Sequence, residues 1–536
     1  MSEIKYKILD NVIYTDDPGD NSDPKGVGHF YYTRMIQNRD KIAQIDGYTK
    51  EEDTFGSLLQ RSVRTALTLL DKGLKPGDHI SLCTNHHFNS PVPHIASFFT
   101  GLIMGAIEPK MSVKDAAHVL KQTLPKIIFV TSEAVTFVEK VIELIGTKIE
   151  IVVFDQTEQH TSFFDFIRPH KDEDSFKPKE VENLNETAII VFSSGSTGMP
   201  KGICYSHRNM LCLTKTTQDY LKVLYSIANP YWNVFIICLQ ASIDRGFPRI
   251  VYPCFNEKDP WTLFYQHVDH AFLNTLQALH MVRSKKTEHV NLEHVKVLSI
   301  GGNPITAKQF DEVKLALPHT IVLQVYSQSE SFNSILGFPL TPFGIQLSQK
   351  NVGSAGTILD GMSYKIVDIK TEKNLGPNEV GELRIKSRSQ FIGYFNKDST
   401  ECFDFDGWLK TGDLCYYNEN LCFYIVDRIR ETFKFSIYHI SPIEIENAIL
   451  SLEPVETAIV IGIPHETDIC HPMAIVKLKS NAKEISAKEI IKYVEDNFEN
   501  KNRLRGGVKF VDNFPMTVTG KINRFKLKKM VLNNQI

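Results

Sequence analysis

The sequence predicts an α/β protein: a large N-terminal domain of two wound α/β sheets plus a small β-rich subdomain, and a smaller α+β C-terminal domain. First, strand-like and helical patterns alternate on both sides of a polar connector at residues 156–186, as expected for mostly parallel sheets covered by helices. Second, helical spacing nearly disappears over residues 353–424. Third, a compact mixed pattern follows from Asp427 onward. We therefore predict domains at residues 1–426 and 427–536.

The first wound unit follows a polar, turn-rich stretch at residues 1–50. Apolar residues at helical spacing, followed by a Lys-Pro-Gly stop signal at residues 75–77, predict its first helix. Short apolar runs predict the strands. In chain order we expect a helix at 55–70, a strand at 80–83, a helical pattern to 104, a strand at 127–130, a helix at 134–144 and a strand at 149–154.

The second wound unit begins with an apolar run that leads into a Ser/Gly-rich loop and an expected helix. Its expected strands lie at 187–192, 249–252, 295–300 and 321–325. The β-rich subdomain has expected strands at 364–367, 381–385 and 421–424. The C-terminal domain is expected to hold a helix from 442, strands at 457–463 and 474–478, a helix at 487–498 and a strand at 508–511.

Composition limits the kinds of partner. The 536 residues are 42% hydrophobic and 23% charged, an ordinary globular mixture. A formal charge of −3 gives no basic field for nucleic acid, so we expect a small charged substrate. The 9 cysteines are scattered without Cys-x-x-Cys, which predicts neither a disulfide framework nor a zinc site and fits a reducing compartment. No apolar run is long enough to span a membrane, so a soluble protein is expected. The oligomeric state stays open.

The loop after the strand at 187–192 has the composition of a phosphate cradle. Glycines let backbone N–H groups approach an anion, hydroxyls donate hydrogen bonds, and a lysine adds charge. It is not a Walker A loop, because Gly-Lys-Ser/Thr is missing. A flexible Ser/Gly linker is the alternative, against which the preceding strand and the Pro-Lys pair argue. The candidate ligands are Ser193, Ser194, Gly195, Ser196, Thr197, Gly198 and Lys201.

This loop, SSGSTGMPKG, resembles the phosphate loop of the adenylate-forming superfamily, which includes acyl-CoA synthetases, 4-coumarate CoA ligases and insect luciferases. The resemblance spans nearly the whole chain, from Lys75-Pro76-Gly77-Asp78 through Lys521. It implies ATP and Mg²⁺ as cofactors, CoA as co-substrate and a small-molecule carboxylic acid as substrate.

A second motif leaves the strand at 321–325 with an aromatic, a hydroxyl and a carboxylate in succession. Alone it reads as a polar strand end. Next to the phosphate loop it resembles the family's Tyr-Gly-x-Thr-Glu motif. The resemblance implies Gln324 and Tyr326 beside adenine, Ser329 on phosphate and Glu330 on Mg²⁺, a hard cation that prefers oxygen.

This motif and a nearby loop differ from the family pattern in detail. Ser327 replaces the motif's glycine. Gly302 and Asn303 follow a strand and resemble the adenine-flanking loop, with Asn303 where alanine is common. An ordinary β-to-α turn is the alternative for that loop.

Two later motifs resemble the family's ribose contacts and its hinge. Asp413 follows Thr-Gly, where the family binds the ribose hydroxyls. Arg428 follows Asp427 at the second ribose contact, and Arg430 falls on the interdomain hinge; a surface ion pair is the alternative for Asp427 and Arg428.

Two lysines are candidate catalytic residues in this resemblance. Lys434 lies where the family keeps a lysine for the second half-reaction. Lys521, in a Pro-x-x-x-x-Gly-Lys pattern, would neutralise charge on the carboxylate and the α-phosphate. The alternative for Lys521 is one more basic residue of a basic C-terminal helix.

Two departures from the family concern the acyl pocket and the thiol tunnel. Asn233 stands where a histidine is usual, and Trp232 and Phe235 are expected beside it in the substrate pocket. Ile437 stands where a glycine lets pantetheine pass, and a β-branched side chain there would obstruct the tunnel. Adenylation is therefore the firmer expectation of the two half-reactions.

The leading hypothesis is an ATP-dependent carboxylic acid:CoA ligase. The alternatives are an adenylate-binding protein or pseudoenzyme without the thioester step, and a luciferase-like monooxygenase of an acyl adenylate. The chain ends Asn-Asn-Gln-Ile rather than in the Ser-Lys-Leu address of many insect relatives. We therefore expect a cytoplasmic protein, with the peroxisome as the alternative.

Overall fold

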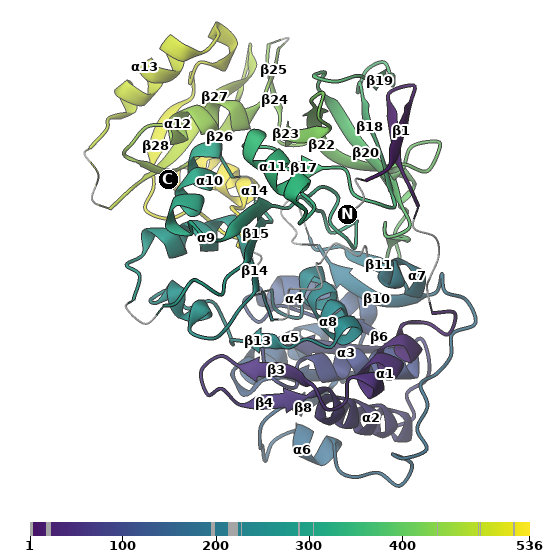
Figure 1. The fold of residues 1–536 in the computed structure, drawn as a ribbon. Coiled ribbons are helices and arrows are strands. Elements are labelled where there is room, and N and C mark those ends of the chain that lie inside the picture. Colours follow the sequence, from purple (N-terminus) through teal and green to yellow (C-terminus); the bar gives the residue numbers. More distant parts are fainter. Residues whose placement is uncertain are drawn as a thin grey trace.

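The computed structural model describes residues 4–17, 23–193, 199–212, 223–226, 228–287, 290–303, 305–436, 438–480, 482, 484–517 and 520–536. Figure 1 shows the first wound sheet in the lower half, the second wound sheet running upward beside it on the left, and an antiparallel sheet and the C-terminal domain side by side at the top. The predicted fold class is confirmed, since four sheets of the expected kinds are present in the described chain.

The first wound sheet has the strand order β21-β11-β10-β6-β5-β7-β8-β9. Its strand β7 reads Ile-Ile-Phe-Val, and alternate residues enter two different hydrophobic clusters. Such a strand is buried on both faces, as expected in a parallel sheet. The bounds are β5 His79–Cys83, β6 Ile103–Gly105, β7 Ile127–Val130, β8 Glu150–Val153, β9 Thr161–Ser162, β10 Thr187–Phe192, β11 Gly202–Ser206 and β21 Gly393–Tyr394.

The second wound sheet has the order β16-β15-β14-β12-β13-β3-β4 and is parallel from β16 to β3. Its bounds are β3 Ile42–Asp46, β4 Glu52–Thr54, β12 Leu224–Ser226, β13 Arg249–Val251, β14 His270–Asn274, β15 Val297–Gly301 and β16 Ile321–Gln324.

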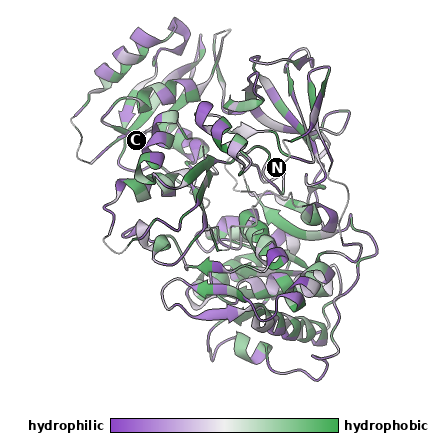
Figure 2. Ribbon diagram, in the orientation of Figure 1, coloured by the Kyte–Doolittle hydropathy of each residue, from purple (hydrophilic) through white to green (hydrophobic). Residues whose placement is uncertain are grey.

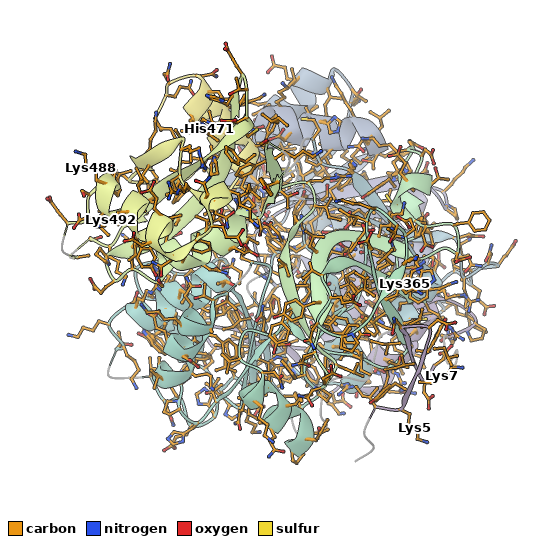
Figure 3. The ribbon with its side chains drawn as sticks, turned by 90° about the horizontal axis from the view of Figure 1, so that it is seen from above. Lys5, Lys7, Lys365, His471, Lys488 and Lys492 are labelled. Carbon is orange, nitrogen blue, oxygen red and sulfur yellow. The ribbon has the colours of Figure 1, made fainter. Side chains whose placement is uncertain are left out.

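The third sheet is antiparallel and forms the β-rich subdomain. An N-terminal hairpin extends it, because β2 pairs with β18. Lys365 on β18 is buried, and its ammonium lies 2.6 Å from Asp404 and over the Trp408 ring. Figure 3 labels Lys365 in this sheet. The bounds are β1 Tyr6–Leu9, β2 Val12–Thr15, β17 Gly356–Thr357, β18 Met362–Val367, β19 Asn374–Leu375, β20 Gly381–Ser387, β22 Leu409–Tyr417 and β23 Cys422–Arg428.

The C-terminal sheet has the order β25-β24-β27-β26, with β28 parallel to β27. Helices α12 and α14 pack on β26, and α13 packs beside β28. The strand bounds are β24 Phe433–Phe435, β25 Tyr438–Ile440, β26 Val455–His465, β27 Ile469–Leu478 and β28 Gly507–Phe510.

The helices cover the sheets and carry mixed polarity, whereas the central strands are mainly hydrophobic (Figure 2). Helix α2 begins at an N-cap, Thr54, whose side chain accepts a hydrogen bond from the Ser57 N–H. The α-helices are α1 Val27–Gln37, α2 Phe55–Asp71, α3 Pro91–Thr100, α4 Val113–Thr123, α5 Val135–Ile145, α6 Phe163–Phe166, α7 His207–Leu211, α8 Asn233–Arg245, α9 Thr275–Arg283, α10 Ala307–Ala316, α11 Pro342–Lys350, α12 Pro442–Leu450, α13 Ala487–Asn497 and α14 Arg524–Leu532.

Short 3₁₀ turns add η1 Ser132–Ala134, η2 Pro260–Phe264, η3 Thr400–Cys402 and η4 Asn500–Asn502. Among the described residues, no helix combines the length and the apolarity that crossing a membrane requires.

Most predicted elements are present within a few residues, with four differences. The helical pattern expected to 104 ends at Thr100, because Gly101 caps α3 in the left-handed conformation, and residues 103–105 form strand β6. The connector at 156–186 contains β9 and α6.

The segment after the phosphate loop begins as strand β11, antiparallel to β10, and not as a helix, because residues 203–205 form a short buried apolar run. The stretch at 1–50, read as polar and turn-rich, contains β1, β2, α1 and β3. Its first strand, β1, is exposed throughout and pairs only with β2 in a local hairpin, and β2 joins the sheet through the distant β18, so β1 shows no apolar alternation.

Candidate active site

A cleft of about 1380 Å³ lies between the second wound sheet and the C-terminal domain. One wall is formed where β15 and β16 end, the edge at which open α/β sheets bind ligands. The opposite wall comes from α12, β26 and residues 513–516 and 521–524. Sequence motifs far apart in the chain meet here: Gly302, Asn303, Gln324, Tyr326, Asp413, Arg428 and Lys521 all line the cleft.

Asp413 is the buried anionic centre of this cleft. It lies opposite Arg428 in the β22–β23 ladder, and Arg428 Nε lies 3.0 Å from Asp413 Oδ1. The Tyr326 hydroxyl donates to Asp413 Oδ2. Burial raises the pKa of Asp413, against the opposing effect of Arg428. Within the described residues Oδ1 makes the ion pair with Arg428 but accepts no hydrogen bond, so it is placed to accept one from a hydroxyl of a ligand.

Lys521 reaches the same cleft from the C-terminal domain. Its backbone N–H donates to Thr517 Oγ1 at 3.0 Å, and its carbonyl accepts from the Thr517 N–H at 2.6 Å. Gly520 closes this turn with φ +71, a backbone conformation that favours glycine. Burial, and then the charge of Arg428, lower the pKa of Lys521 to about 8. An anion in the cleft would compensate this cation.

Glu330 lies in a second cluster, next to the predicted phosphate loop. The Tyr394 hydroxyl donates to Glu330 Oε1 at 2.7 Å, and the Lys201 ammonium lies 4.8 Å from the Tyr394 ring centroid. Lys201 and Ser193 close the two ends of the loop, since the Lys201 N–H donates to Ser193 Oγ at 3.0 Å. The other predicted loop ligands, Ser194, Gly195, Ser196, Thr197 and Gly198, lie outside the described residues.

The predicted substrate-pocket residues lie at the start of α8: Trp232 is its N-cap, and Asn233 and Phe235 lie in its first turn. Asn233 lies beside the buried Tyr205 hydroxyl, which donates to the Ser329 carbonyl. Trp232 lies beside the buried Glu108 carboxylate. Phe235 is 1% exposed and packs in the core against the rings of His86 and His94. The contacts of Asn233 place it near the Ser329 to Glu330 motif.

Two predicted residues lie at the surface. Arg430 is exposed in the connection after β23. Lys434 is exposed on β24, paired in register with residue 439. Their predicted roles in the hinge and in the second half-reaction stay predictions, and Ile437 lies outside the described residues.

Sequence reasoning missed a network that holds the Lys521 segment in place. Arg524 Nη2 lies 2.6 Å from Glu446 Oε2, and Arg524 Nε lies 2.9 Å from Glu431 Oε2. Next to it Asp427 accepts from the Ser441 hydroxyl, and burial raises the pKa of Asp427 to about 6. In the sequence Arg524 looked like one basic residue among several, because its partners lie on other elements.

Comparison with known proteins defines the family. The model of the AMP-binding enzyme matches residues 33–395, more than half of the chain, and that of the AMP-binding enzyme C-terminal domain matches residues 444–521. The chain belongs to the AMP-binding enzyme family. The predicted adenylate-forming family and acyl-adenylate-forming ligase class are thereby confirmed.

Among relatives of this AMP-binding enzyme, a luciferin 4-monooxygenase of Photuris pensylvanica is 30% identical, over 91% of this chain and 92% of the relative. The 4-coumarate–CoA ligase-like 9 of Arabidopsis thaliana is 29% identical, over 90% of this chain and 85% of the relative.

Two solved structures show the likeness in three dimensions. The luciferase-like enzyme of the nonluminescent mealworm Zophobas morio is 31% identical, with a TM-score of 0.73 over 78% of this chain and 99% of that one. An anthranilate CoA ligase bound to anthranoyl-AMP has a TM-score of 0.83 over 96% of this chain and 99% of that one, at 19% identity, and shows the shared fold.

Proposed function

We propose that this AMP-binding enzyme is an ATP- and Mg²⁺-dependent carboxylic acid:CoA ligase. It converts a small-molecule acid and ATP to acyl-AMP and pyrophosphate, and then transfers the acyl group to CoA. The observation that carries the proposal is the meeting of Tyr326, Asp413 and Arg428 with Lys521 in one cleft. The first three come from the N-terminal part of the chain up to β23, and the lysine comes from the C-terminal domain.

The cleft residues suit the parts of ATP. Asp413 Oδ1 accepts a ribose hydroxyl, while Tyr326 and Arg428 keep the carboxylate in position. Gly302, Asn303 and Gln324 line the adenine end, and Asn303 Nδ2 is a buried donor without a hydrogen-bond partner in the described chain. Ser193, Lys201 and Ser329 would contact the phosphates.

Charge stabilisation drives the first half-reaction. The acid's carboxylate attacks the α-phosphorus, and Lys521 neutralises charge that develops there and on the carboxylate. Glu330 would hold Mg²⁺, because a carboxylate oxygen is a ligand that this cation prefers. When bound, Mg²⁺ shields the phosphate oxygens from the incoming carboxylate.

The second half-reaction requires a different face of residues 427–536. We propose that this domain turns about Asp427 to Arg430 and brings Lys434, exposed on β24, towards the acyl-adenylate. The boundary lies at the end of β23, which extends to Arg428. Limited proteolysis tests the hinge: the first cut is expected at 429–432 and should slow when ATP and an acid are added. A first cut in the connector at 156–186, unaffected by ligands, would contradict it.

A panel of aromatic and aliphatic acids tests the reaction. Pyrophosphate release should depend on ATP and on one class of acid, and acyl-CoA should appear only when CoA is present. Lys434→Ala should lose acyl-CoA formation and keep single-turnover formation of acyl-AMP, with Lys488→Ala, exposed on α13 of the same domain, as the surface control. Pyrophosphate release without acyl-CoA from the wild type would favour a protein that stops at the adenylate.

A luciferase-like monooxygenase is the second candidate, because the 30% identical relative is a luciferin 4-monooxygenase. Similarity to luciferases does not by itself imply light emission, since a luciferase-like enzyme that resembles this chain comes from a nonluminescent mealworm. Light emission with ATP, a luciferin and oxygen would support this candidate. For localisation we propose the cytoplasm, with the peroxisome as the alternative that a relative named peroxisomal OPC-8:0-CoA ligase 1 supports.

A further inference from the structure

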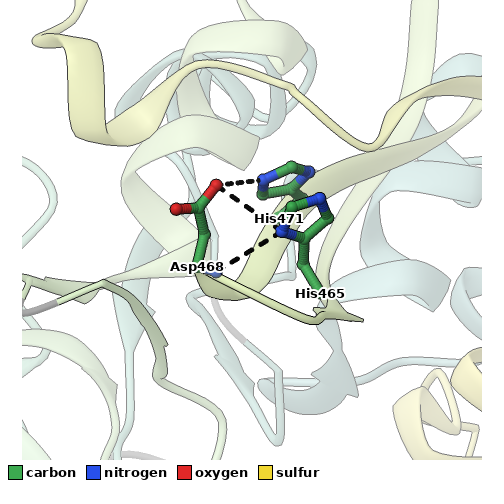
Figure 4. A group of neighbouring side chains, drawn as sticks. All are labelled: His465, Asp468 and His471. Atoms are coloured by element: carbon green, nitrogen blue, oxygen red, sulfur yellow. Dashed lines mark hydrogen bonds and ion pairs between the residues drawn. The ribbon is translucent and has the colours of Figure 1, made fainter.

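The turn between β26 and β27 carries two histidines and an aspartate that the proposed reaction does not use. His465 lies opposite Ile469 in the ladder, and His471 lies opposite Ile463 two residues away. Because side chains alternate along a strand, both imidazoles lie on the same face of the hairpin. Asp468 sits in the turn between them, and Figure 4 shows its carboxylate reaching both rings.

We propose that His465, Asp468 and His471 form a binding site for a divalent transition metal of the zinc class. One ligand atom of each residue lies within 4.8 Å of the other two. His471 Nε2 lies 2.8 Å and His465 Nδ1 lies 3.6 Å from Asp468 Oδ2. Ligand atoms of tetrahedral zinc lie about 3.3 Å apart, given Zn–N bonds of about 2.0 to 2.1 Å. The observed distances bracket this value.

The chemistry of the three groups selects this class of metal. Two imidazoles and one carboxylate suit zinc and its neighbours, whereas Ca²⁺ and Mg²⁺ prefer oxygen ligands throughout. His465 Nδ1 lies 3.4 Å from the Asp468 backbone nitrogen and 3.2 Å from the Thr467 hydroxyl, and a bound metal would replace these contacts. The side chains are 41%, 35% and 18% exposed, which leaves room for water as a fourth ligand.

A second histidine pair lies near an aspartate, but there a lysine already pairs with the carboxylate. His267 and His294 stack with ring centroids 4.9 Å apart, near Asp269. There the Lys296 ammonium lies 2.5 Å from Asp269 Oδ1 and competes with any metal for the carboxylate. The His465 and His471 rings are closer, 3.7 Å between centroids and 20° from parallel. The nearby Arg505 is held by Asn500 and by the face of Phe435.

A metal here would fix the turn against β24. The Ser436 N–H donates to the Asp468 carbonyl at 2.8 Å, and Phe435 pairs in register with Ile469. Ser436 and Ile469 both have left-handed backbone, at φ 51 and φ 67, a costly conformation for such residues. Figure 3 places His471 in the C-terminal domain, as it does Lys488 and Lys492. Because the turn contacts Phe435 and Ser436, a metal bound there would also hold strand β24, which carries Lys434.

Calorimetric titration of the EDTA-treated full-length protein with ZnCl₂ tests the site. We expect one equivalent of binding that His465→Ala and His471→Ala each weaken by roughly 10- to 100-fold or more. His160→Ala is the matched control, because His160 pairs with a single carboxylate, Glu139, at 2.9 Å. Cys470→Ser should still bind one equivalent of zinc with unchanged affinity, since the ligand set contains no thiol.

Two further measurements make the result decisive. Co²⁺ should give visible absorption in the wild type and in His160→Ala but not in His471→Ala. Zn²⁺ should slow hydrogen exchange of the Ser436 N–H in the wild type and in His160→Ala but not in His471→Ala. Equal zinc affinity, within twofold, of the wild type and the His465→Ala/His471→Ala double variant would overturn the proposal, provided that circular dichroism shows both folded.

Discussion

The protonation of Lys521 should set the alkaline limit of adenylation. Its pKa is lowered to about 8, chiefly by burial and then by Arg428. Only the protonated ammonium neutralises charge at the α-phosphate. Because the folded pKa lies below the ordinary value of 10.5, the free enzyme loses this cation as pH rises through about 8. The value of kcat/KM for ATP reports groups of the free enzyme and should fall in that window.

The size of the decrease follows from the titration of one group. With a pKa of about 8, roughly nine tenths of the lysine is protonated at pH 7 and roughly one eleventh at pH 9. The value of kcat/KM for ATP should therefore drop about tenfold between these pH values. Tyr326 does not contribute, because burial and Asp413 raise its pKa well above the ordinary value.

Stopped-flow or coupled detection of pyrophosphate across pH 6 to 10 measures this profile. Lys521→Arg is the informative variant, since a guanidinium stays protonated throughout the range. Its profile should lose the alkaline decrease even if its maximal rate is lower. A wild-type profile that is flat to pH 10, or an arginine variant with an unchanged decrease near pH 8, would refute the assignment of this limb to Lys521.

Three other changes test separate parts of the structure. Asp413→Ala should weaken ATP binding by on the order of 1 to 3 kcal/mol, roughly 5- to 150-fold, because the ribose loses a buried acceptor; an unchanged Kd in calorimetry would count against the ribose contact. Arg524→Met should lower the free energy of unfolding by up to about 3 kcal/mol, since Glu446 and Glu431 lose their partner, and a denaturation midpoint equal to that of Lys528→Met would contradict this. Ile437→Gly should raise the rate of acyl-CoA formation and leave CoA-independent pyrophosphate release unchanged; no gain in the CoA step would show that the side chain does not obstruct the thiol.

The elements that the sequence predicts well are those in which local pattern and burial agree. Strands β7 and β10 are continuous apolar runs, and their bounds match the predicted 127–130 and 187–192. Strand β1 could not be found this way, because its four residues are all exposed and its stability depends on pairing with β2, which joins β18. At β11 the sequence predicts a helix and the structure has a strand, because a short buried apolar run fits either element.

The candidate site shows the same division. Motif spacing identifies Asp413 and Lys521, and folding brings them to one cleft. No spacing connects Arg524 with Glu446, because their contact depends on how α14 lies against α12. The metal-binding proposal also arises from register, since His465 and His471 become neighbours only when the hairpin pairs.

Acid-dependent exchange of labelled pyrophosphate into ATP, measured without CoA, tests the central claim most directly. It detects reversible acyl-AMP formation in the cleft and does not depend on the hinge, on Lys434 or on Ile437. We predict exchange with one class of acid in the panel, and its loss in Lys521→Ala with ATP affinity largely retained. Exchange that persists undiminished in Lys521→Ala, or its absence with every acid in a protein that binds ATP, would contradict the account.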